Sequence, residues 1–167
     1  MCYNRKDDME SFANKAFIEN AVSRYSDMII RIAFNFVKNR ADAEDIMQEA
    51  FMALIKKAPI FNEEEHLKAW LIRVAVNKSK NRLKAAKQRR ECALSAADGP
   101  YTDAYSEVFD EIMKLPEADR ATVYLFYIEG YSAKEIAKLL GKTKNSVFMR
   151  LTRAREKLKQ FLEVKES

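Results

Sequence analysis

The segment from Ser132 to Phe161 constrains the fold of this chain most strongly, because it carries the signals for two helices and the turn between them. Ser132 with Glu135 three residues later forms a capping box, which predicts a helix start. Gly141 opens a three-residue turn, and a longer amphipathic stretch begins at Lys144. This is the helix-turn-helix pattern, whose second helix enters the major groove of DNA, although any short helical hairpin has a similar pattern.

The rest of the 167-residue chain also has the pattern of helices. Three glycines and three prolines are too few for the turns of a many-stranded barrel or sandwich. Apolar residues recur at helical spacing, as at Ala43, Ile46, Ala50 and Leu54. Because 48% of the residues are hydrophobic, a packed core is expected and wholesale disorder is excluded. The sequence therefore predicts an all-α fold.

Charge is unevenly distributed along the chain. Residues 78–90 hold seven bases and no acid, residues 91–111 hold six acids and no base, and residues 142–159 hold seven bases against Glu156. Basic blocks attract phosphates without reading a base sequence. One such block is usually a solvated helix face, but two of them favour a nucleic-acid partner.

The acidic block contains a candidate linker. Asp98, Gly99 and Pro100 form a strong helix breaker among small polar residues. We interpret residues 89–106 as a linker between an N-terminal part, 1–88, and a C-terminal part, 107–167. Each part is long enough for a helical domain.

Three acids at spacings of three and four share one face of a helix predicted over residues 42–56: Asp42, Asp45 and Glu49. A metal site or a general acid–base pair would need further donors or a nearby histidine. Acids near a helix start also stabilise the helix dipole. A docking face for a basic partner is the third interpretation.

A further helix is predicted after the break at Ala58 and Pro59, with Asn62 and Glu65 as its capping box. Its apolar side includes Trp70, which we assign to the core. Its opposite side carries a polar, basic row: Arg73, Asn77, Lys80, Asn81 and Lys84. Arg and Asn can read base edges, and Lys neutralises phosphate.

Features of enzymes and of exported or membrane proteins are absent from the sequence. The single histidine, His66, is interpreted as a surface or capping residue, and Cys2 and Cys92 have no metal-ligand spacing. We expect free thiols in a reducing cytoplasm, no catalytic residue, no metal and no cofactor. No stretch approaches the roughly 20 apolar residues of a membrane span, and the N-terminus is not a secretory signal.

Five runs of the sequence, taken in order, resemble the sigma-70 family: residues 42–51, 70–77, 115–120, 132–137 and 150–155. Their order and the short linker are similar to the extracytoplasmic-function (ECF) sub-family, over about residues 15 to 162. The resemblance implies two small helical domains joined by a flexible linker. Residues 1–88 would be the region 2 helical bundle, 89–106 the linker, and 107–167 the region 4 helix-turn-helix.

The resemblance also implies a role for the acidic helix. In the family this helix docks on the coiled-coil of the polymerase β′ subunit, while the outer surface of region 4 meets the β-flap. The acidic linker would mimic RNA on its way towards the polymerase active centre. The residues implied to bind polymerase are Asp42, Asp45, Ile46, Gln48, Glu49 and Phe51.

Two DNA-binding sets follow from the same resemblance. Family members capture a flipped base of the −10 element in the loop that corresponds to residues 57–66. The residues implied for the −10 element are Phe61, Asn62, His66, Arg73, Asn77, Lys80, Asn81 and Lys84. Those implied for the −35 element are Lys142, Lys144, Asn145, Ser146, Phe148, Met149, Arg150 and Arg153. Many members have Asp in place of Asn81 and a base in place of Phe148, so the promoter sequence does not carry over.

The expected protein is therefore a sigma factor that binds core RNA polymerase and promoter DNA and is itself not an enzyme. An anti-sigma factor is an implied partner, and neither a small-molecule substrate nor membrane insertion is expected. Two other classes are considered beside it. A stand-alone helix-turn-helix regulator would leave the acidic helix without a purpose. An enzyme acting on nucleic acid would need a metal cluster or a nucleophile–base pair.

Overall fold

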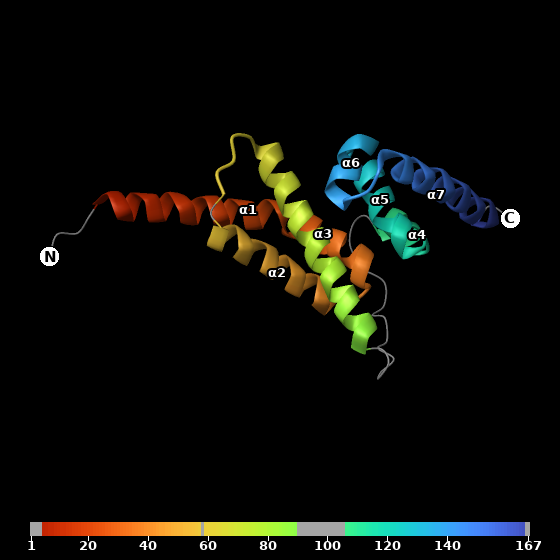
Figure 1. Ribbon diagram of the computed structural model, residues 1–167, viewed down its shortest axis with the longest axis horizontal. Coiled ribbons are helices and arrows are strands. Elements are labelled where there is room, and N and C mark those ends of the chain that lie inside the picture. The colour runs from red at the N-terminus through yellow and green to blue at the C-terminus, as the bar shows by residue number, and fades with distance from the viewer. Residues whose placement is uncertain (1–4, 58, 90–105, 166–167) are drawn as a thin grey trace.

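The computed structural model describes residues 5–57, 59–89 and 106–165, and within these ranges the chain forms seven helices and no strand. The all-α prediction is confirmed for this part of the chain. The predicted linker, 89–106, lies outside the described residues except at its two ends. The helices are α1 (Arg5–Val37), α2 (Arg40–Lys57), α3 (Glu64–Arg89), α4 (Ser106–Met113), α5 (Glu117–Tyr127), α6 (Ala133–Leu140) and α7 (Lys144–Lys165) (Figure 1).

Helices α1, α2 and α3 pack on one another as a three-helix unit (Figure 1). Apolar residues at helical spacing put one side of each helix in a shared core. The largest fully buried side chains in this unit are Ile29, Ile32, Ile46, Leu54, Leu71 and Ile72. The charged residues of α2 and α3 are thereby left at the rim of the unit, where the two helices face each other.

A two-residue turn sets the start of α2. Lys38 closes α1 in the left-handed region, at φ 53°, and its N–H donates to the Phe34 carbonyl at 3.0 Å. Glycine is the usual residue at such a position. The Asn39 side chain then accepts the Asp42 N–H at 2.8 Å, which caps the first turn of α2. The turn therefore holds Asp42 in place at the beginning of the helix.

The predicted start of α3 is wrong by one residue. The N–H groups of His66 and Leu67 both donate to the Glu63 carbonyl, at 3.1 and 3.4 Å, and the helix begins at Glu64. Glu63 therefore occupies the N-cap position that the sequence assigned to Asn62. Asn62 remains in the preceding loop, with its side chain exposed.

Helices α4 to α7 form the second unit and confirm the helix-turn-helix. Ser132 and Glu135 make the predicted capping box at the start of α6, and Gly141 ends α6 in the left-handed region at φ 63°. Thr143 then caps α7, because its hydroxyl accepts the Ser146 N–H at 3.2 Å. Residues 141–143 are thus the tight turn that the sequence predicted.

The two units are in contact, with α1 on α5 and α3 on α6, and we call this contact the seam. The Phe34 and Phe109 rings pack with centroids 6.1 Å apart. The buried Arg120 of α5 donates from Nε to the Asn35 carbonyl of α1 at 2.7 Å. One continuous core therefore runs through both units.

Candidate functional site

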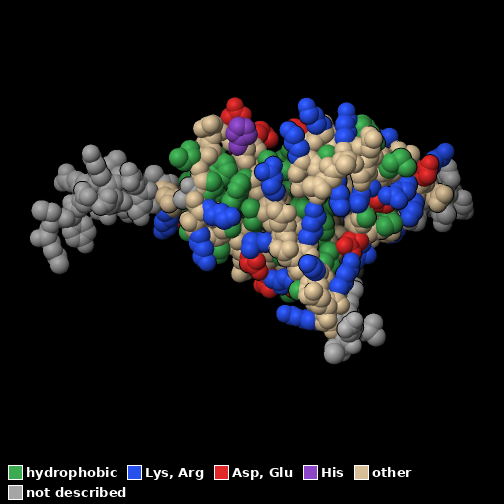
Figure 2. Space-filling model, viewed as in Figure 1, with side chains coloured by type: hydrophobic (Ala, Val, Ile, Leu, Met, Phe, Trp, Pro, Cys, Tyr) green, Lys and Arg blue, Asp and Glu red, His purple; other side chains and the backbone are tan. Residues whose placement is uncertain are grey.

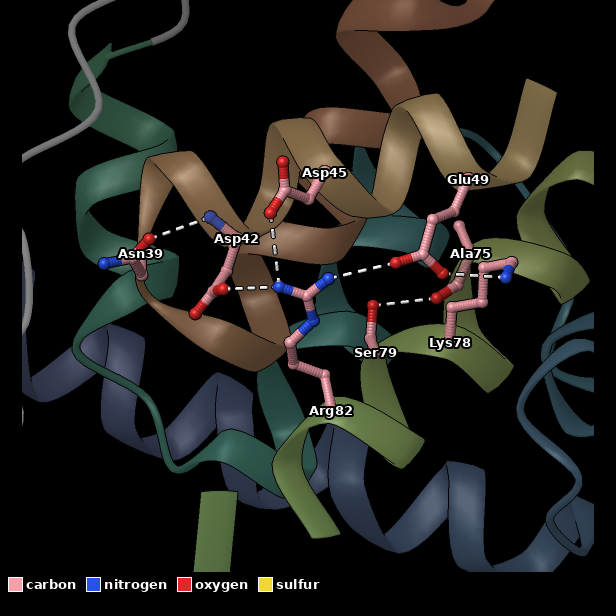
Figure 3. Close-up of polar contacts among 8 residues, drawn as sticks. All are labelled: Asn39, Asp42, Asp45, Glu49, Ala75, Lys78, Ser79 and Arg82. Carbon is pink, nitrogen blue, oxygen red and sulfur yellow. Dashed lines mark hydrogen bonds and ion pairs between the residues drawn. The ribbon is translucent and has the colours of Figure 1, made fainter. Parts of the chain in front are cut away.

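The acidic face of α2 is covered in part by two bases from α3 (Figure 3). Arg82 Nη1 lies 2.6 Å from Asp42 Oδ1 and 3.4 Å from Asp45 Oδ2, while its Nη2 lies 3.0 Å from Glu49 Oε1. Lys78 Nζ lies 2.8 Å from the other oxygen of Glu49. Three carboxylates thus share two cations, so the cluster keeps one net negative charge.

The electrostatics of Glu49 follow from this arrangement. The hydrogen bond from Lys78 lowers the pKa of the Glu49 carboxyl below its ordinary value, against partial burial, which raises it. The charge and hydrogen bond of Arg82 lower it further. Glu49 is consequently ionised at neutral pH, as a docking face for a basic partner requires.

Two of the implied polymerase-binding residues lie in the core. Ile46 is fully buried and Phe51 is 5% exposed, so their side chains are not available to a partner in this structure. They hold α2 against its neighbours instead.

The outer face of α2 carries residues that the sequence analysis left unassigned. Met52 and Ile55 are each 48% exposed. With the exposed Asp45 and Gln48 they follow spacings of three, four and three, which places all four on one face of the helix. In the sequence, this face could have been recognised from the spacing, and from the fact that Met52 and Ile55 do not belong to the row of buried apolar residues. The outer face therefore combines acids with exposed apolar side chains.

A hollow of about 270 Å³ lies between α1 and the loop before α3. Phe61 and Asn62 line it, together with Arg24 and Tyr25 of α1 and with Glu64. His66 is not among the residues that line it. The hollow thus brings together two of the three loop residues that the resemblance implied and adds residues of α1.

Hydrogen bonding shapes one wall of this hollow. The Tyr25 hydroxyl donates to Glu64 Oε1 at 2.6 Å, and Arg24 pairs with the same carboxylate. Burial, followed by the bond to Glu64, raises the pKa of Tyr25 to about 12, so its hydroxyl stays protonated. The Phe61 ring, which also lines the hollow, packs edge-on against Trp70 with centroids 5.9 Å apart. Arg24 and Tyr25 could not be expected here from the sequence, because only the packing of α1 beside the loop brings them to the hollow.

The polar row of α3 is presented to solvent along most of its length. Its exposed members are Arg73, Asn77, Asn81 and Lys84. Lys80 differs, because it is half-buried and its Nζ donates to the Leu140 carbonyl of α6 at 2.5 Å. Lys80 is therefore held at the seam.

The start of α7 presents several of the residues implied for the −35 element. Phe148 and Met149 are 49% and 62% exposed, and Lys144 lies over the Phe148 ring, 5.5 Å from its centroid. The other exposed residues of the set are Lys142, Asn145 and Arg153. These accessible side chains extend from the turn to the third turn of α7.

Three of the implied −35 residues also hold the helix-turn-helix together. The Arg150 guanidinium donates to the Ala118 carbonyl of α5, and its Nε lies 3.4 Å from the Ser146 hydroxyl. Arg153 lies 3.4 Å from the buried Asp119 carboxylate. Arg150 and Ser146 are therefore half-buried, whereas Arg153 remains exposed.

An ion pair crosses the seam beside these residues. Lys68 of α3 lies 3.0 Å from Glu129, with side chains only 22% and 13% exposed. The Tyr124 hydroxyl donates to the other Glu129 oxygen at 3.0 Å. Lys68 also lies over the Tyr131 ring, 5.4 Å from its centroid. The seam thus brings residues of α3 directly against α5, α6 and the loop between them.

Figure 2 shows Lys and Arg side chains spread over the face that runs from α3 to α7. Within the described ranges, no group of three or more His, Cys, Asp or Glu side chains is placed to hold a metal ion. In this part of the chain, no helix combines the length and the apolarity that a membrane span requires.

Comparisons with known proteins cover both units. Residues 21–90 match the sigma-70 region 2 family, and residues 106–158 match the sigma-70 region 4 family. The ECF RNA polymerase sigma-E factor of Haemophilus influenzae is 32% identical over 155 residues, which cover 81% of this chain and 82% of that protein. The ECF RNA polymerase sigma factor SigW of Bacillus subtilis is 26% identical, with 95% and 92% covered.

Two solved structures have a similar fold. The sigma factor RpoE in complex with the anti-sigma factor NepR from Bartonella quintana is 21% identical, with a TM-score of 0.70 over 87% of this chain and 96% of that one. CnrH in complex with the cytosolic domain of CnrY is 25% identical, with a TM-score of 0.61 over 90% of each chain. Both similarities span the two units.

Proposed function

Because this chain belongs to the ECF sigma factors of the sigma-70 family, which direct RNA polymerase to promoters, we propose which of its surfaces bind the polymerase and which bind promoter DNA. Residues 1–88 form region 2, residues 107–167 form region 4, and residues 89–106 link them. The matches to the two family regions, at 21–90 and 106–158, support this division. The polymerase performs the chemistry, and the chain works in the cytoplasm beside it.

The outer face of α2 docks on the β′ coiled-coil. Its contact residues are Asp45, Gln48 and Glu49, with Met52 and Ile55 as the apolar part of the same face. The exposure of all five supports the assignment, as does the net negative charge that Arg82 and Lys78 leave on the cluster. Interfaces of this kind combine apolar anchors with charges that select the partner. The outer surface of region 4 meets the β-flap.

The hollow beside Phe61 and Asn62 takes a flipped base of the −10 element. Extruding a base costs a few kcal/mol of stacking, which the pocket offsets by stacking and hydrogen bonding. Phe61 offers a ring, Asn62 an amide, and the hollow of about 270 Å³ has room for a base. The exposed row on α3, at Arg73, Asn77, Asn81 and Lys84, contacts the neighbouring strand, whereas His66 lies outside the hollow and serves at most a phosphate.

The start of α7 reads the −35 element in the major groove. Lys144 and Asn145 are placed for base edges and phosphates, and Phe148 and Met149 for thymine methyl groups. Lys142 and Arg153 flank them as backbone contacts. The exposure of this group at the N-terminal part of a recognition helix is the observation that supports the assignment.

The two DNA sites require the seam to open. The names of the elements place them about 25 base pairs apart, which is about 80 Å along a duplex of 34–36 Å per turn. In the structure, Lys80 of the −10 set touches Leu140, beside the −35 set, at 2.5 Å. We therefore interpret the structure as a closed form, which opens when both elements are bound. Anti-sigma factors are natural partners for such a form, as RpoE is solved with NepR.

Gel filtration with purified bacterial core polymerase, followed by genomic run-off transcription, tests this function. Co-elution with discrete new transcripts is expected, and aligned start sites reveal both promoter elements. Asn77→Ala should lose most promoter-specific transcript while still co-eluting, whereas the matched control Lys87→Ala, an exposed α3 residue outside the set, should keep it. A chain that elutes apart from core polymerase and shifts duplex DNA alone would instead be a stand-alone regulator.

A further inference from the structure

An open-sided hollow of about 170 Å³ lies in the seam, where α3 meets α5, α6 and the start of α7. Three cations from three different segments line it: Lys80 of α3, Lys142 of the turn and Arg150 of α7. The single carboxylate among the lining residues is Glu117 of α5. The hollow therefore carries an excess of positive charge.

Two of the three cations are held there by neutral partners. Lys80 donates to the Leu140 carbonyl at 2.5 Å, and Arg150 donates to the Ala118 carbonyl. Lys142 is exposed beside them. Among the described residues, no carboxylate pairs with any of the three. Carbonyl partners fix the positions of the side chains without neutralising their charge.

The cations lie close enough to repel one another. The pKa of Lys80 is lowered first by partial burial and then by the charges of Lys142 and Arg150. Glu117 is shared, because its charge also stabilises Lys38 and Arg120, whose pKa values are lowered mainly by burial. Closing the seam therefore gathers three positive charges around a hollow that holds one carboxylate.

A multiply charged oxyanion supplies the negative charge that the hollow lacks. The hollow of about 170 Å³ far exceeds the 10–15 Å³ that one water needs, so it admits a phosphoryl group with its waters. Lys and Arg donors directed at one space suit tetrahedral phosphate oxygens, and charge-assisted bonds of this type are strong. Two features oppose an anion, namely Glu117, which is exposed, and the Leu140 carbonyl at the negative end of α6. A single negative charge would be too weak against them, so two or more are needed.

We propose that this hollow is a binding site for a phosphate-class anion with at least two charges, and that the bound anion holds region 2 and region 4 together. Free phosphate, diphosphate and the phosphates of a nucleotide share this chemistry. The anion binds the closed form, because only there do Lys80, Lys142 and Arg150 face one space. By linkage it favours closure. Lys142 is also assigned to the promoter backbone, so the anion would compete with promoter DNA. That consequence rests on the proposed function, whereas the binding does not.

Isothermal titration of the full chain tests the site with three probes, namely inorganic phosphate, diphosphate and ADP, in chloride at matched ionic strength. One saturable site is expected, tighter for diphosphate than for phosphate. ADP as tight as diphosphate would identify phosphate alone as the ligand group, and tighter ADP binding would add recognition of the nucleoside. Absence of saturable binding of all three probes would overturn the proposal.

Two variants distinguish binding at this site from the general attraction of anions to a basic protein. Lys142→Gln should weaken diphosphate binding about tenfold, the usual effect of one charge-assisted contact. Lys138→Gln, an exposed change on the neighbouring α6 outside the hollow, should bind as the unchanged chain does. Equal weakening by the two variants would show that the anion is held by net charge only and would contradict the site.

Discussion

The basic residues on two sides of α3 have opposite electrostatic surroundings. Lys78 and Arg82, one turn apart, face α2 and meet three carboxylates at 2.6 to 3.4 Å. Lys80 lies about 200° around the helix from each of them and meets Lys142 and Arg150 instead. On the first side, the bases are paired with carboxylates of the same three-helix unit. The second brings like charges together between two units.

This difference separates structural charges from functional ones. A base that is paired within the α1–α3 unit stabilises the unit and is not available to DNA. Lys80, Lys142 and Arg150 keep their charge for a phosphate, at the cost of repulsion when the seam is closed. The seam is held elsewhere, by the packing of Phe34 of α1 on Phe109 of α4 and by the Lys68–Glu129 pair.

The largest effect is expected at that pair. Lys68→Met leaves the Glu129 carboxylate, 13% exposed, without its cation, and removing one partner of a poorly solvated pair is costly. We expect the free energy of unfolding to fall by about 2–3 kcal/mol. Urea denaturation followed by circular dichroism measures it, with Lys87→Met on the exposed side of α3 as the control. Equal unfolding midpoints for the two variants would show that the pair does not hold the seam.

A smaller loss is expected on the α2 side. Arg82→Met leaves Asp42, Asp45 and Glu49 with Lys78 alone, so three carboxylates repel at partly exposed positions. A network of exposed pairs of this size is worth about 1–2 kcal/mol. The same denaturation measures it against Arg89→Met, an exposed base near the end of α3. If both arginine variants unfold alike, Arg82 has no structural role.

The pH dependence of stability sharpens the same comparison. The hydrogen bond from Lys78 is the main cause of the lowered pKa of Glu49. A carboxyl with a lowered folded-state pKa contributes fully above its ordinary value of about 4.3 and loses that contribution as pH falls through the lowered pKa. In Lys78→Met the pKa of Glu49 rises towards the ordinary value. The unfolding free energy of the variant should therefore change less steeply below about pH 5 than that of the unchanged chain.

Urea titrations at a series of pH values measure this slope. Lys87→Met should keep the slope of the unchanged chain. An unaltered slope in Lys78→Met would mean that Lys78 does not set the titration of Glu49.

The smallest effect should have the opposite sign. Lys142→Gln removes one of three like charges at the seam, so in chloride we expect a gain of up to about 0.5 kcal/mol in unfolding free energy. The contrast with Arg82→Met is the essential result, because removing a base is costly between α2 and α3 and harmless at the seam. A loss of stability in Lys142→Gln, absent from Lys138→Gln, would contradict the repulsion.

Local signals in the sequence predicted much of the fold and the exposure of the polar row on α3. The capping box at Ser132, the turn at Gly141 and the exposed row on α3 all depend on spacing within one or two helices, and the structure has each of them. The helix start at Asn62 failed because Glu63 provides the carbonyl that begins α3. The spacing of Asn62 and Glu65 did not indicate this one-residue shift.

Contacts between helices were beyond the reach of the sequence. The acids of α2 were recognised as one face, but their pairing with Arg82 depends on how α3 crosses α2. The burial of Ile46 and Phe51 likewise depends on that packing. The family resemblance had implied both as contact residues, and their burial could not be predicted from the sequence. The meeting of Lys80 with Lys142 and Arg150 joins residues 60 or more positions apart and arises only when the seam closes.

The most direct test of the account is the distance between α3 and α6 before and after promoter binding. Fluorescent labels at Lys87→Cys and Lys138→Cys, in a chain with Cys2→Ser and Cys92→Ser, report it by energy transfer. The account predicts close labels in the free chain and a separation larger by tens of Å with core polymerase and promoter DNA, since the two elements lie about 80 Å apart on the duplex. Unchanged, efficient transfer in a complex that transcribes from the promoter would contradict it.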